Sequence, residues 1–307
     1  MPAIEVDGLV KAYDGKRVVD DVSFEIEAGE IFGIVGPNGA GKTTIVESIA
    51  GLRDPDAGTI SVLGLDPATD HYEIAQRLGV QLQESELQPK VRVGEILETY
   101  ASFYRDPADW RELVERFDLA EKIAAPYADL SGGMKQKLSA ALALVGSPEA
   151  VILDELTTGL DPRARRSTWS TVERIRDAGV TVLLVTHFMD EAERLCDRIM
   201  VVNGGAVAAI DTPEGLAGRT GYEQLMTFEP SAPVSADDLR GVADVIEVTT
   251  DDESVTVAGI GNVVINVLTS LLERDIRANR LRVEQSGLED AYLAITGEAS
   301  GSLEEDA

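Results

Sequence analysis

Nine consecutive residues near the N-terminus have the types and spacing of a loop that holds phosphate groups. They are Gly36, Pro37, Asn38, Gly39, Ala40, Gly41, Lys42, Thr43 and Thr44, and they contain the pattern Gly-x-x-x-x-Gly-Lys-Thr. Glycines allow successive backbone N–H groups to face one anion, and a helix N-terminus adds a favourable dipole. The pattern predicts an ATP-binding loop in which Lys42 contacts the β and γ phosphates and the Thr43 hydroxyl binds Mg²⁺. An ordinary glycine-rich turn is the alternative, and the flanking strand, helix and Lys-Thr pair argue against it.

Two acidic residues follow a short apolar run near the middle of the chain. Residues 151–153 have the composition of a buried strand, and Asp154 and Glu155 come directly after them. Such a strand places carboxylates at the C-terminal edge of a parallel sheet, where α/β proteins bind ligands. Asp154 can then hold the Mg²⁺ shell, usually through water, and Glu155 can polarise an attacking water. A strand ending in a solvated acidic loop is the alternative, which the phosphate-loop pattern disfavours.

Short β-branched runs alternate with helical patterns through the first 215 residues, which predicts an α/β fold with a largely parallel sheet. Strands are expected at 18–27, 31–35, 58–62, 78–82, 150–153, 181–186 and 199–203, and helices at 43–50 and 162–178. Strand signals are few from about residue 84 to 145, where helices are expected at 94–104, 107–117 and 133–145. This segment is predicted to be a helical insertion in the α/β domain.

A smaller α+β domain is expected over residues 216–297. Its strands are predicted at 225–229, 245–250 and 254–258, and its helices at 262–274 and 288–296. Residues 298–307 are acidic, small and polar, which predicts a disordered tail.

The composition limits the classes of function. The chain has 55 acidic and 27 basic residues, a net charge of −28, which argues against binding nucleic acid through a broad basic face. A single cysteine, Cys196, excludes an internal disulfide and is expected to be a small buried filler rather than a catalytic thiol. We find no signal peptide and no apolar run long enough to span a bilayer, so the chain is expected to be soluble and to reach a membrane only through a partner.

A third motif indicates which class of phosphate-loop ATPase the chain resembles. Leu130, Ser131, Gly132, Gly133 and Met134 resemble the signature loop of ABC-transporter ATPases, which simple P-loop kinases and GTPases lack. The resemblance covers about residues 4–215, with the main motifs in the family's order. It implies a P-loop NTPase domain with an ABC-type helical subdomain. Two residues depart from the common pattern: Met134 replaces a glutamine, as in export-type members, and Leu156 replaces a proline that rigidifies the turn after the catalytic glutamate.

The resemblance also implies roles for single residues. Tyr13 matches the aromatic residue that stacks on adenine, and Gln83 matches the glutamine that contacts Mg²⁺ and the attacking water. Asp161 belongs to the loop that communicates between paired subunits, and His187 matches the histidine that contacts the γ-phosphate. Without the other motifs, each would have a plainer explanation as a surface or structural residue. His71 matches no motif and is expected on the surface.

The signature residues predict that the ATP site is shared between subunits. A serine and two glycines that open a helix form a second anion-binding N-terminus, which one ATP cannot easily use together with the first on a single domain. In the family, this second terminus binds the γ-phosphate held by the opposite subunit. The resemblance therefore implies a head-to-tail dimer with a second copy or a paralogous ATPase, which closes on ATP and opens after hydrolysis.

Residues 130–136, 186–193 and 287–297 resemble the ATPases of ABC-2-type exporters, the drug and multidrug efflux branch. This implies a separate integral-membrane permease, whose cytoplasmic helix would dock between the Gln83 loop and the helical insertion. The chain would then lie in the cytoplasm at the inner face of the membrane. The alternative is a soluble ABC-type ATPase acting in translation, DNA repair or Fe–S assembly. Translation members usually carry two ATPase domains, DNA-repair members carry long coiled coils, and Fe–S assembly members lack the C-terminal unit. The permease selects the substrate.

The acidic excess predicts adaptation to concentrated salt. At 1 M ionic strength the Debye length is about 3 Å, so self-repulsion between like charges is screened. We expect the melting temperature of the purified chain to rise with KCl concentration in a thermal denaturation series. A flat or falling curve would identify the acidic composition as that of an ordinary cytosolic protein instead.

Overall fold

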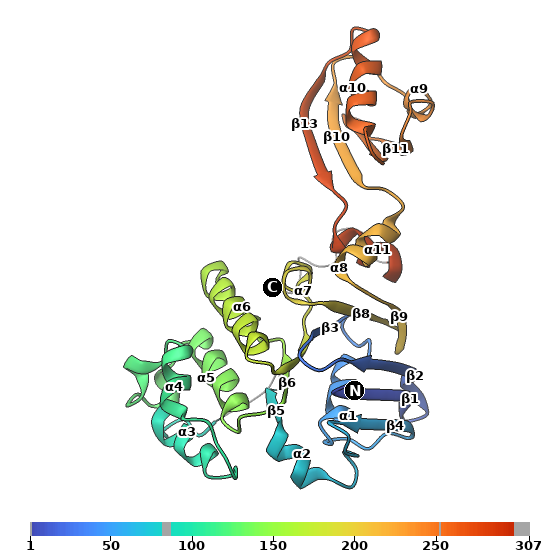
Figure 1. The fold of residues 1–307 in the computed structure, drawn as a ribbon. Helices are drawn as coiled ribbons and strands as arrows, with labels where there is room; N and C mark the ends of the chain where they lie inside the picture. Colours follow the sequence, from blue (N-terminus) through green and yellow to red (C-terminus); the bar gives the residue numbers. More distant parts are fainter. Residues whose placement is uncertain (1, 82–86, 252, 298–307) are drawn as a thin grey trace. The chain divides into compact units, whose positions relative to one another are not determined.

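The computed structural model describes residues 2–81, 87–251 and 253–297, and these divide into two compact units, 2–213 and 214–297 (Figure 1). The predicted domain boundary at residue 215 lies two residues after this division. The predicted tail, 298–307, lies outside the described residues. No helix in the described part of the chain combines the length and apolar character needed to cross a membrane.

The first unit is built on a six-stranded sheet in the order β5-β6-β7-β3-β8-β9. The strands are β3 (Ile31–Val35), β5 (Leu78–Gln81), β6 (Ala150–Asp154), β7 (Thr181–Val185), β8 (Arg198–Asn203) and β9 (Ala206–Asp211). Pairing is parallel throughout except between β8 and β9. Strands β3, β6 and β7 are buried along their whole length, as continuous apolar runs predict. The expected largely parallel α/β sheet is confirmed.

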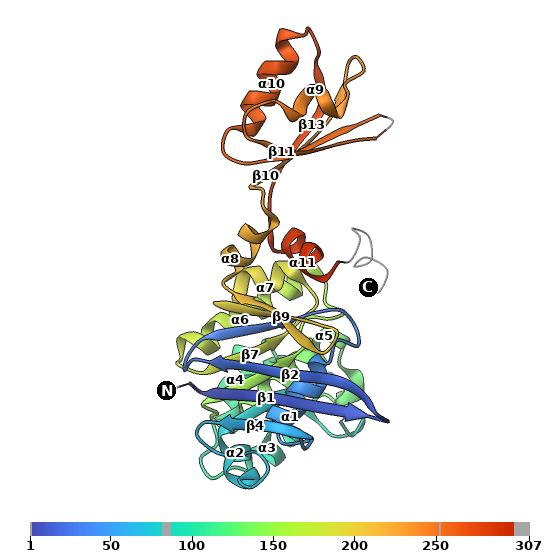
Figure 2. The same ribbon diagram turned by 90° about the vertical axis from the view of Figure 1, so that its right-hand side faces the viewer.

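A separate antiparallel sheet joins β2 (Lys16–Ile26), β1 (Ile4–Tyr13) and β4 (Ala57–Val62), which Figure 2 shows as one layer. Its apolar residues share one core with helix α1 (Lys42–Ile49) and the larger sheet. Strand β1 was not predicted from sequence. Its register shifts between Val6 and Leu9, where Gly8 has φ 61°, and this bulge breaks the two-residue alternation that marks a strand.

The expected helical insertion contains α3 (Val93–Ala101), α4 (Trp110–Arg116) and α5 (Gly132–Leu144). In Figure 1 these helices group beside β5, away from the antiparallel sheet. Two of them are shorter than predicted. The chain turns after Ala101, and α4 begins only where Asp109 accepts a hydrogen bond from the Arg111 N–H. The other α-helices described in this unit are α2 (His71–Arg77), which was not predicted, α6 (Pro162–Asp177) and α7 (Met189–Leu195).

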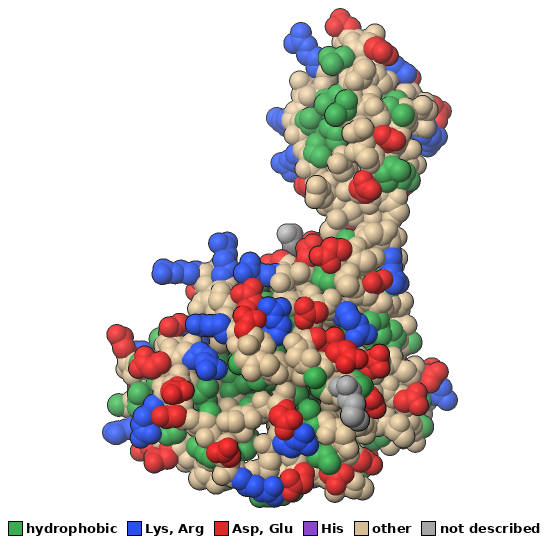
Figure 3. Space-filling view, viewed as in Figure 1, with side chains coloured by type: hydrophobic (Ala, Val, Ile, Leu, Met, Phe, Trp, Pro, Cys, Tyr) green, Lys and Arg blue, Asp and Glu red, His purple; other side chains and the backbone are tan. Residues whose placement is uncertain are grey.

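The second unit contains an antiparallel sheet in the order β11-β12-β10-β13. Its strands are β10 (Gln224–Pro230), β11 (Val245–Thr250), β12 (Val255–Gly259) and β13 (Ala278–Gln285); its helices are α8 (Pro213–Ala217), α9 (Ala236–Arg240), α10 (Val263–Glu273) and α11 (Leu288–Thr296). One sheet face packs on α9 and α10 through Met226, Phe228, Leu239, Val257 and Val267. On the face drawn in Figure 3, hydrophobic side chains gather on this unit over β13 and α10.

Candidate active site

The phosphate-loop residues connect the end of β3 to the start of α1, as the sequence predicts. Gly41 is the N-cap of α1 with φ 101°, and Gly39 has φ 78°, a region that only glycine enters readily. A Cβ at Gly36 would lie 2.3 Å from the carbonyl oxygen of Val202, and one at Gly41 would lie 2.6 Å from that of Val18. Both glycines are therefore required by close backbone approach as well as by loop conformation.

Lys42 lies underneath this loop. Its side chain is buried and donates hydrogen bonds to the carbonyl oxygens of Gly36, at 2.6 Å, and Pro37, at 3.1 Å. Asn38, Gly39 and Thr43 are exposed, whereas Thr44 is buried. The loop thus presents exposed residues above a buried ammonium group, an arrangement suited to a polyanion.

Asp154 ends β6 in a buried position next to this lysine. Burial raises the pKa of its carboxyl group to about 6; the carboxylates of Glu155 and Glu47 act in the same direction and the Lys42 ammonium opposes them. The Oδ2 atom is buried and has no hydrogen-bond partner among the described residues. A buried carboxylate oxygen without a donor fits Mg²⁺, a hard cation that prefers oxygen ligands. Asp154, with the Thr43 hydroxyl, would hold the ion.

Glu155 and His187 meet at the same edge of the sheet. The parallel pairing of β6 with β7 sets Asp154 opposite Val185, and the Glu155 N–H donates to the Val185 carbonyl at 2.9 Å. The chain turns sharply at Glu155, which has φ 52°. Its Oε1 atom then lies 3.7 Å from Nδ1 of His187. The two residues predicted to act on water and on the γ-phosphate are therefore neighbours.

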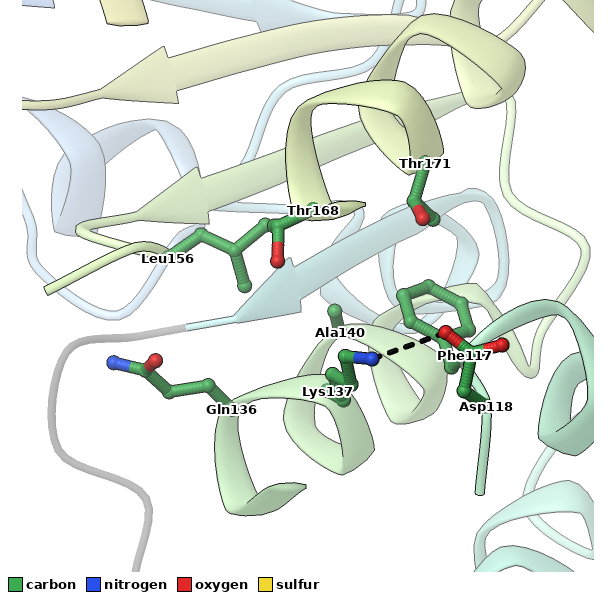
Figure 4. Close-up of a pocket in the computed structure, with 8 residues that line it drawn as sticks. All are labelled: Phe117, Asp118, Gln136, Lys137, Ala140, Leu156, Thr168 and Thr171. Carbon is green, nitrogen blue, oxygen red and sulfur yellow. Dashed lines mark hydrogen bonds and ion pairs between the residues drawn. The ribbon is translucent and has the colours of Figure 1, made fainter. Parts of the chain in front are cut away.

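Leu156 fixes the turn by packing. Its side chain is 2% exposed and lines a cavity of about 10 Å³ together with Gln136 and Ala140 of α5 and Thr168 of α6 (Figure 4). Gln136 also donates a hydrogen bond to the carbonyl oxygen of Thr158. A buried leucine and a side-chain bond to the loop thus stabilise the segment after Glu155, where the resemblance led us to expect a proline.

Gln83 lies outside the described residues. The structure instead shows Gln81, the last residue of β5, buried with its Nε2 atom donating to the Asp154 carbonyl oxygen at 3.2 Å. Sequence reasoning did not select Gln81. The available signal was a polar residue at the end of a buried strand, two positions before the glutamine that matches the family's motif.

Tyr13 ends β1 with 37% of its surface exposed. The Arg53 guanidinium lies 5.2 Å from the centre of its ring, and Arg53 is ion-paired at 2.6 Å with Glu47 of α1. These contacts connect Tyr13 to the helix that follows the phosphate loop. Stacking of Tyr13 on adenine stays a prediction.

The signature residues occupy the start of α5. Leu130 is buried and anchors the segment, while Ser131 and Gly132 are exposed. Ser131 is the N-cap, and its Oγ accepts a hydrogen bond from the Met134 N–H at 3.3 Å. The helix therefore begins one residue earlier than predicted, with an exposed N-terminus of the kind that binds anions.

Asp161 caps α6. Its carboxylate accepts hydrogen bonds from the N–H groups of Arg163 and Ala164, both at 2.9 Å, and these bonds lower its pKa. This capping role is structural. It is compatible with the role in communication between paired subunits that the resemblance implies.

A buried carboxylate that sequence reasoning missed lies behind the site. Glu191, 1% exposed, accepts a hydrogen bond from Nε1 of Trp169 at 2.8 Å. Burial raises its pKa, and hydrogen bonding opposes that rise. Trp169 lies on α6 and Glu191 on α7, so their bond joins the two helices that follow the catalytic candidates Glu155 and His187. No local pattern in the sequence indicated this bond.

Cys196 is buried, and burial raises the pKa of its thiol well above the usual value. Its Sγ lies 2.7 Å from where a Cβ at Gly33 would stand. The prediction of a buried filler is confirmed.

Comparisons with known proteins agree on one family. The family model described as ABC transporter matches residues 19–158. The chain is 36% identical over 304 residues to Nod factor export ATP-binding protein I of Rhizobium etli, covering 97% of this chain and 94% of that protein. It is 35% identical over 308 residues to daunorubicin resistance ATP-binding protein DrrA3 of Streptomyces coeruleorubidus, with 96% of each chain covered. A solved ATP-binding subunit of an ABC transporter superposes with a TM-score of 0.66 at 30% identity, over 71% of this chain and 93% of that one.

The raised pKa of Asp154 predicts a stability cost. Between about pH 4 and pH 6 the folded chain holds a proton that the unfolded chain has lost, so folding stability falls as pH rises through this range. We expect Asp154→Asn to be more stable than wild type by about 3 kcal/mol at pH 7 and by little below pH 4. Urea unfolding across this pH range measures the difference. Asp161→Asn is the control, since the lowered pKa of Asp161 predicts a change of opposite sign.

Proposed function

The chain belongs to the ABC transporter family, in which it is an ATP-binding and ATP-hydrolysing subunit of an exporter, and we propose that the residues described above divide this activity as follows. Backbone N–H groups of the loop from Gly36 to Thr44 surround the phosphates, and Lys42 leaves its loop carbonyls to contact the β and γ phosphates. Thr43, Asp154 and Gln83 would hold Mg²⁺, which would neutralise phosphate charge. Tyr13 stacks on the adenine.

The observation that carries the catalytic assignment is the 3.7 Å approach of His187 to Glu155 beside buried Asp154. Glu155 orients the attacking water and accepts its proton, and His187 contacts the γ-phosphate from the neighbouring strand. Glu191 joins α7, which follows His187, to α6 through the hydrogen bond from Trp169. Anchoring by Leu156 supports a fixed position for Glu155 despite the missing proline.

We propose that a second copy, or a paralogous ATPase, completes the site. The N-terminus of α5, with Ser131 and Gly132 exposed and Gly133 half-buried, supports this, because it is an anion-binding terminus separate from the one at α1. Leu130 and Met134 hold this terminus in position, and Asp161 lies on the loop that faces the partner. Binding of ATP closes a head-to-tail dimer, and hydrolysis opens it.

The partner that uses this motion is an integral-membrane permease of the ABC-2 type. Relatives are named for export of Nod factor and for daunorubicin resistance, which supports an export role and leaves the substrate to the permease. A groove of about 600 Å³ lies between α2, β5 and the segments that follow α1 and α3, and is lined by Leu52, His71, Tyr72, Ile74 and Tyr104 among others. Its apolar lining and size suit one amphipathic helix. Docking there places the chain at the cytoplasmic face of the membrane.

Glu155→Gln should reduce ATP turnover by at least about a hundredfold, because the water loses its base. With ATP and Mg²⁺ the variant should accumulate as a dimer, measured by light scattering after size exclusion at a chain concentration low enough that the nucleotide-free chain is monomeric. Lys42→Ala should lose ATP binding, and Ser131→Arg should bind ATP as a monomer. A Glu155→Gln chain that stays monomeric with saturating ATP would contradict the head-to-tail arrangement.

Leu52→Glu should release the chain from membranes of the source cell, because it puts a charge at the groove where the permease helix docks. Phe103→Glu is the matched control: both residues are 62% exposed, but Phe103 does not line the groove. The measurement is the fraction of tagged chain that sediments with membranes, with ATP binding as the check of folding. Equal release by both variants would show that another surface holds the permease.

A further inference from the structure

The second unit exposes apolar side chains on two adjoining elements. Ile265 and Leu272 of α10 are 64% and 70% exposed, and Leu281 and Val283 of β13 are 39% and 46% exposed. Figure 3 shows hydrophobic atoms gathered over these two elements. Large side chains grouped in this way on a small unit mark an interaction surface rather than scattered exposure.

The two elements adjoin along one flank of α10. Helix α10 buries Val263, Val267 and Leu271 against the sheet, and Asn266 on one flank donates to Asp244 at 2.9 Å. Helical spacing puts Val264, Leu268 and Leu272 on the opposite flank. That flank adjoins β13, since α10 packs on β10 and β13. Val283 pairs with buried Met226 and so shares the sheet face that α10 covers.

Strand β13 is also an open edge of the sheet. It pairs only with β10 among the described strands. The Ser286 N–H donates to the Glu223 carbonyl at 2.9 Å, and antiparallel hydrogen bonding alternates from there. Residues 282 and 284 therefore direct their backbone groups toward β10, while 281, 283 and 285 direct theirs outward. An exposed edge of this length next to an apolar patch is a template for pairing with another strand.

The side chains of β13 determine which strand can pair with its open edge. In an antiparallel pair of two β13 strands, a residue whose backbone groups point outward on one copy lies opposite a residue of the same kind on the other copy. The twofold axis therefore passes through a residue and not between two residues. An axis at residue 282 places Arg282 opposite Arg282, and an axis at residue 284 places Glu284 opposite Glu284. An axis at residue 281 places Arg280 opposite Arg282. Centring at Val283 opposes Arg282 to the Glu284 of the other copy twice, and Val283 to Val283. Charge complementarity selects this register alone.

Two further observations agree with it. Neither Arg282 nor Glu284 has an ion-pair or side-chain hydrogen-bond partner within the described part of the chain, whereas Arg280 bonds to Glu229 at 2.9 Å. In the Val283 register, the Arg–Glu pairs occupy the closely spaced positions of the ladder, where side chains interact most strongly. The apolar flanks of the two α10 helices then lie on the same side of the joined sheet.

We propose that the second unit binds a second copy of this chain through antiparallel pairing of β13 with β13, centred on Val283 and covering the apolar patch with α10. The contact is isologous, with the same surface used on both copies. It does not use the ATP site, so it forms without nucleotide and is distinct from the ATP-dependent closure of the first unit.

Disulfide trapping tests the register on the full chain without nucleotide. In an antiparallel pair that exchanges hydrogen bonds, opposed Cα atoms are about 5.5 Å apart, within disulfide range, so Val283→Cys should cross-link to a dimer under mild oxidation. Arg282→Cys is the matched control, because its diagonal separation of about 7–8 Å is too long. Native Cys196 is buried and common to both variants. Equal cross-linking of both variants, or none with Val283→Cys, overturns the proposal.

Charge reversal tests the pairing energetically. Arg282→Glu or Glu284→Arg alone should weaken the nucleotide-free dimer at least about tenfold in sedimentation equilibrium, whereas the double exchange should restore it. ATPase activity of each variant should equal that of wild type, which separates this contact from the catalytic dimer. A double exchange as weak as the single variants refutes the register. A different outcome would assign the patch to a membrane. In that case the chain forms no dimer but floats with lipid vesicles, and Val283→Glu abolishes the flotation.

Discussion

The register of three parallel strands decides where every reacting group of the first unit lies. β3 pairs with β7, and β7 pairs with β6, so their carboxyl ends meet at one edge of the sheet. The phosphate loop leaves from β3, Asp154 and Glu155 end β6, and His187 follows β7. A shift of one residue in either pairing would turn each of these side chains to the opposite face. Fully buried strands hold the register, because every alternative would expose apolar side chains.

The same edge concentrates groups that the folded chain alone does not satisfy. Asp154 has a raised pKa and a buried oxygen without a described donor, and Glu155 takes a left-handed backbone conformation that non-glycine residues rarely adopt. These features oppose folding stability, and packing around the buried Leu156 offsets part of that cost. Strain and desolvation at such an edge are what a cation and a polyphosphate would relieve, which accords with the proposed Mg²⁺–ATP site.

Sequence predicted those parts of the molecule whose signals are local. The loop at Gly36–Thr44, the acidic end of β6 and the buried strands all carry their patterns within a few residues. Gln81 and Glu191 were missed because their importance comes from distant partners: Gln81 donates to the Asp154 carbonyl, and Glu191 accepts from Trp169. Helix α2 was missed because it buries only Ile74, which leaves no apolar periodicity. Strand β13 was missed because almost its whole length is exposed. Its sequence therefore does not alternate between apolar and polar residues in the way that marks a half-buried strand.

The exposure that hid β13 from prediction also constrains its function. An edge strand with no covering element invites pairing, and natural sheets prevent it with inward charges, prolines or bulges. β13 has left-handed φ only at Arg280, and from Arg282 to Gln285 its pairing with β10 is regular. Arg282 and Glu284 carry opposite charges on one face, so they favour an antiparallel copy of the same strand and disfavour the registers that align like charges. The edge is thus selective rather than merely open. Together with the exposed N-terminus of α5, it gives each unit of the chain a surface that a second copy would complete.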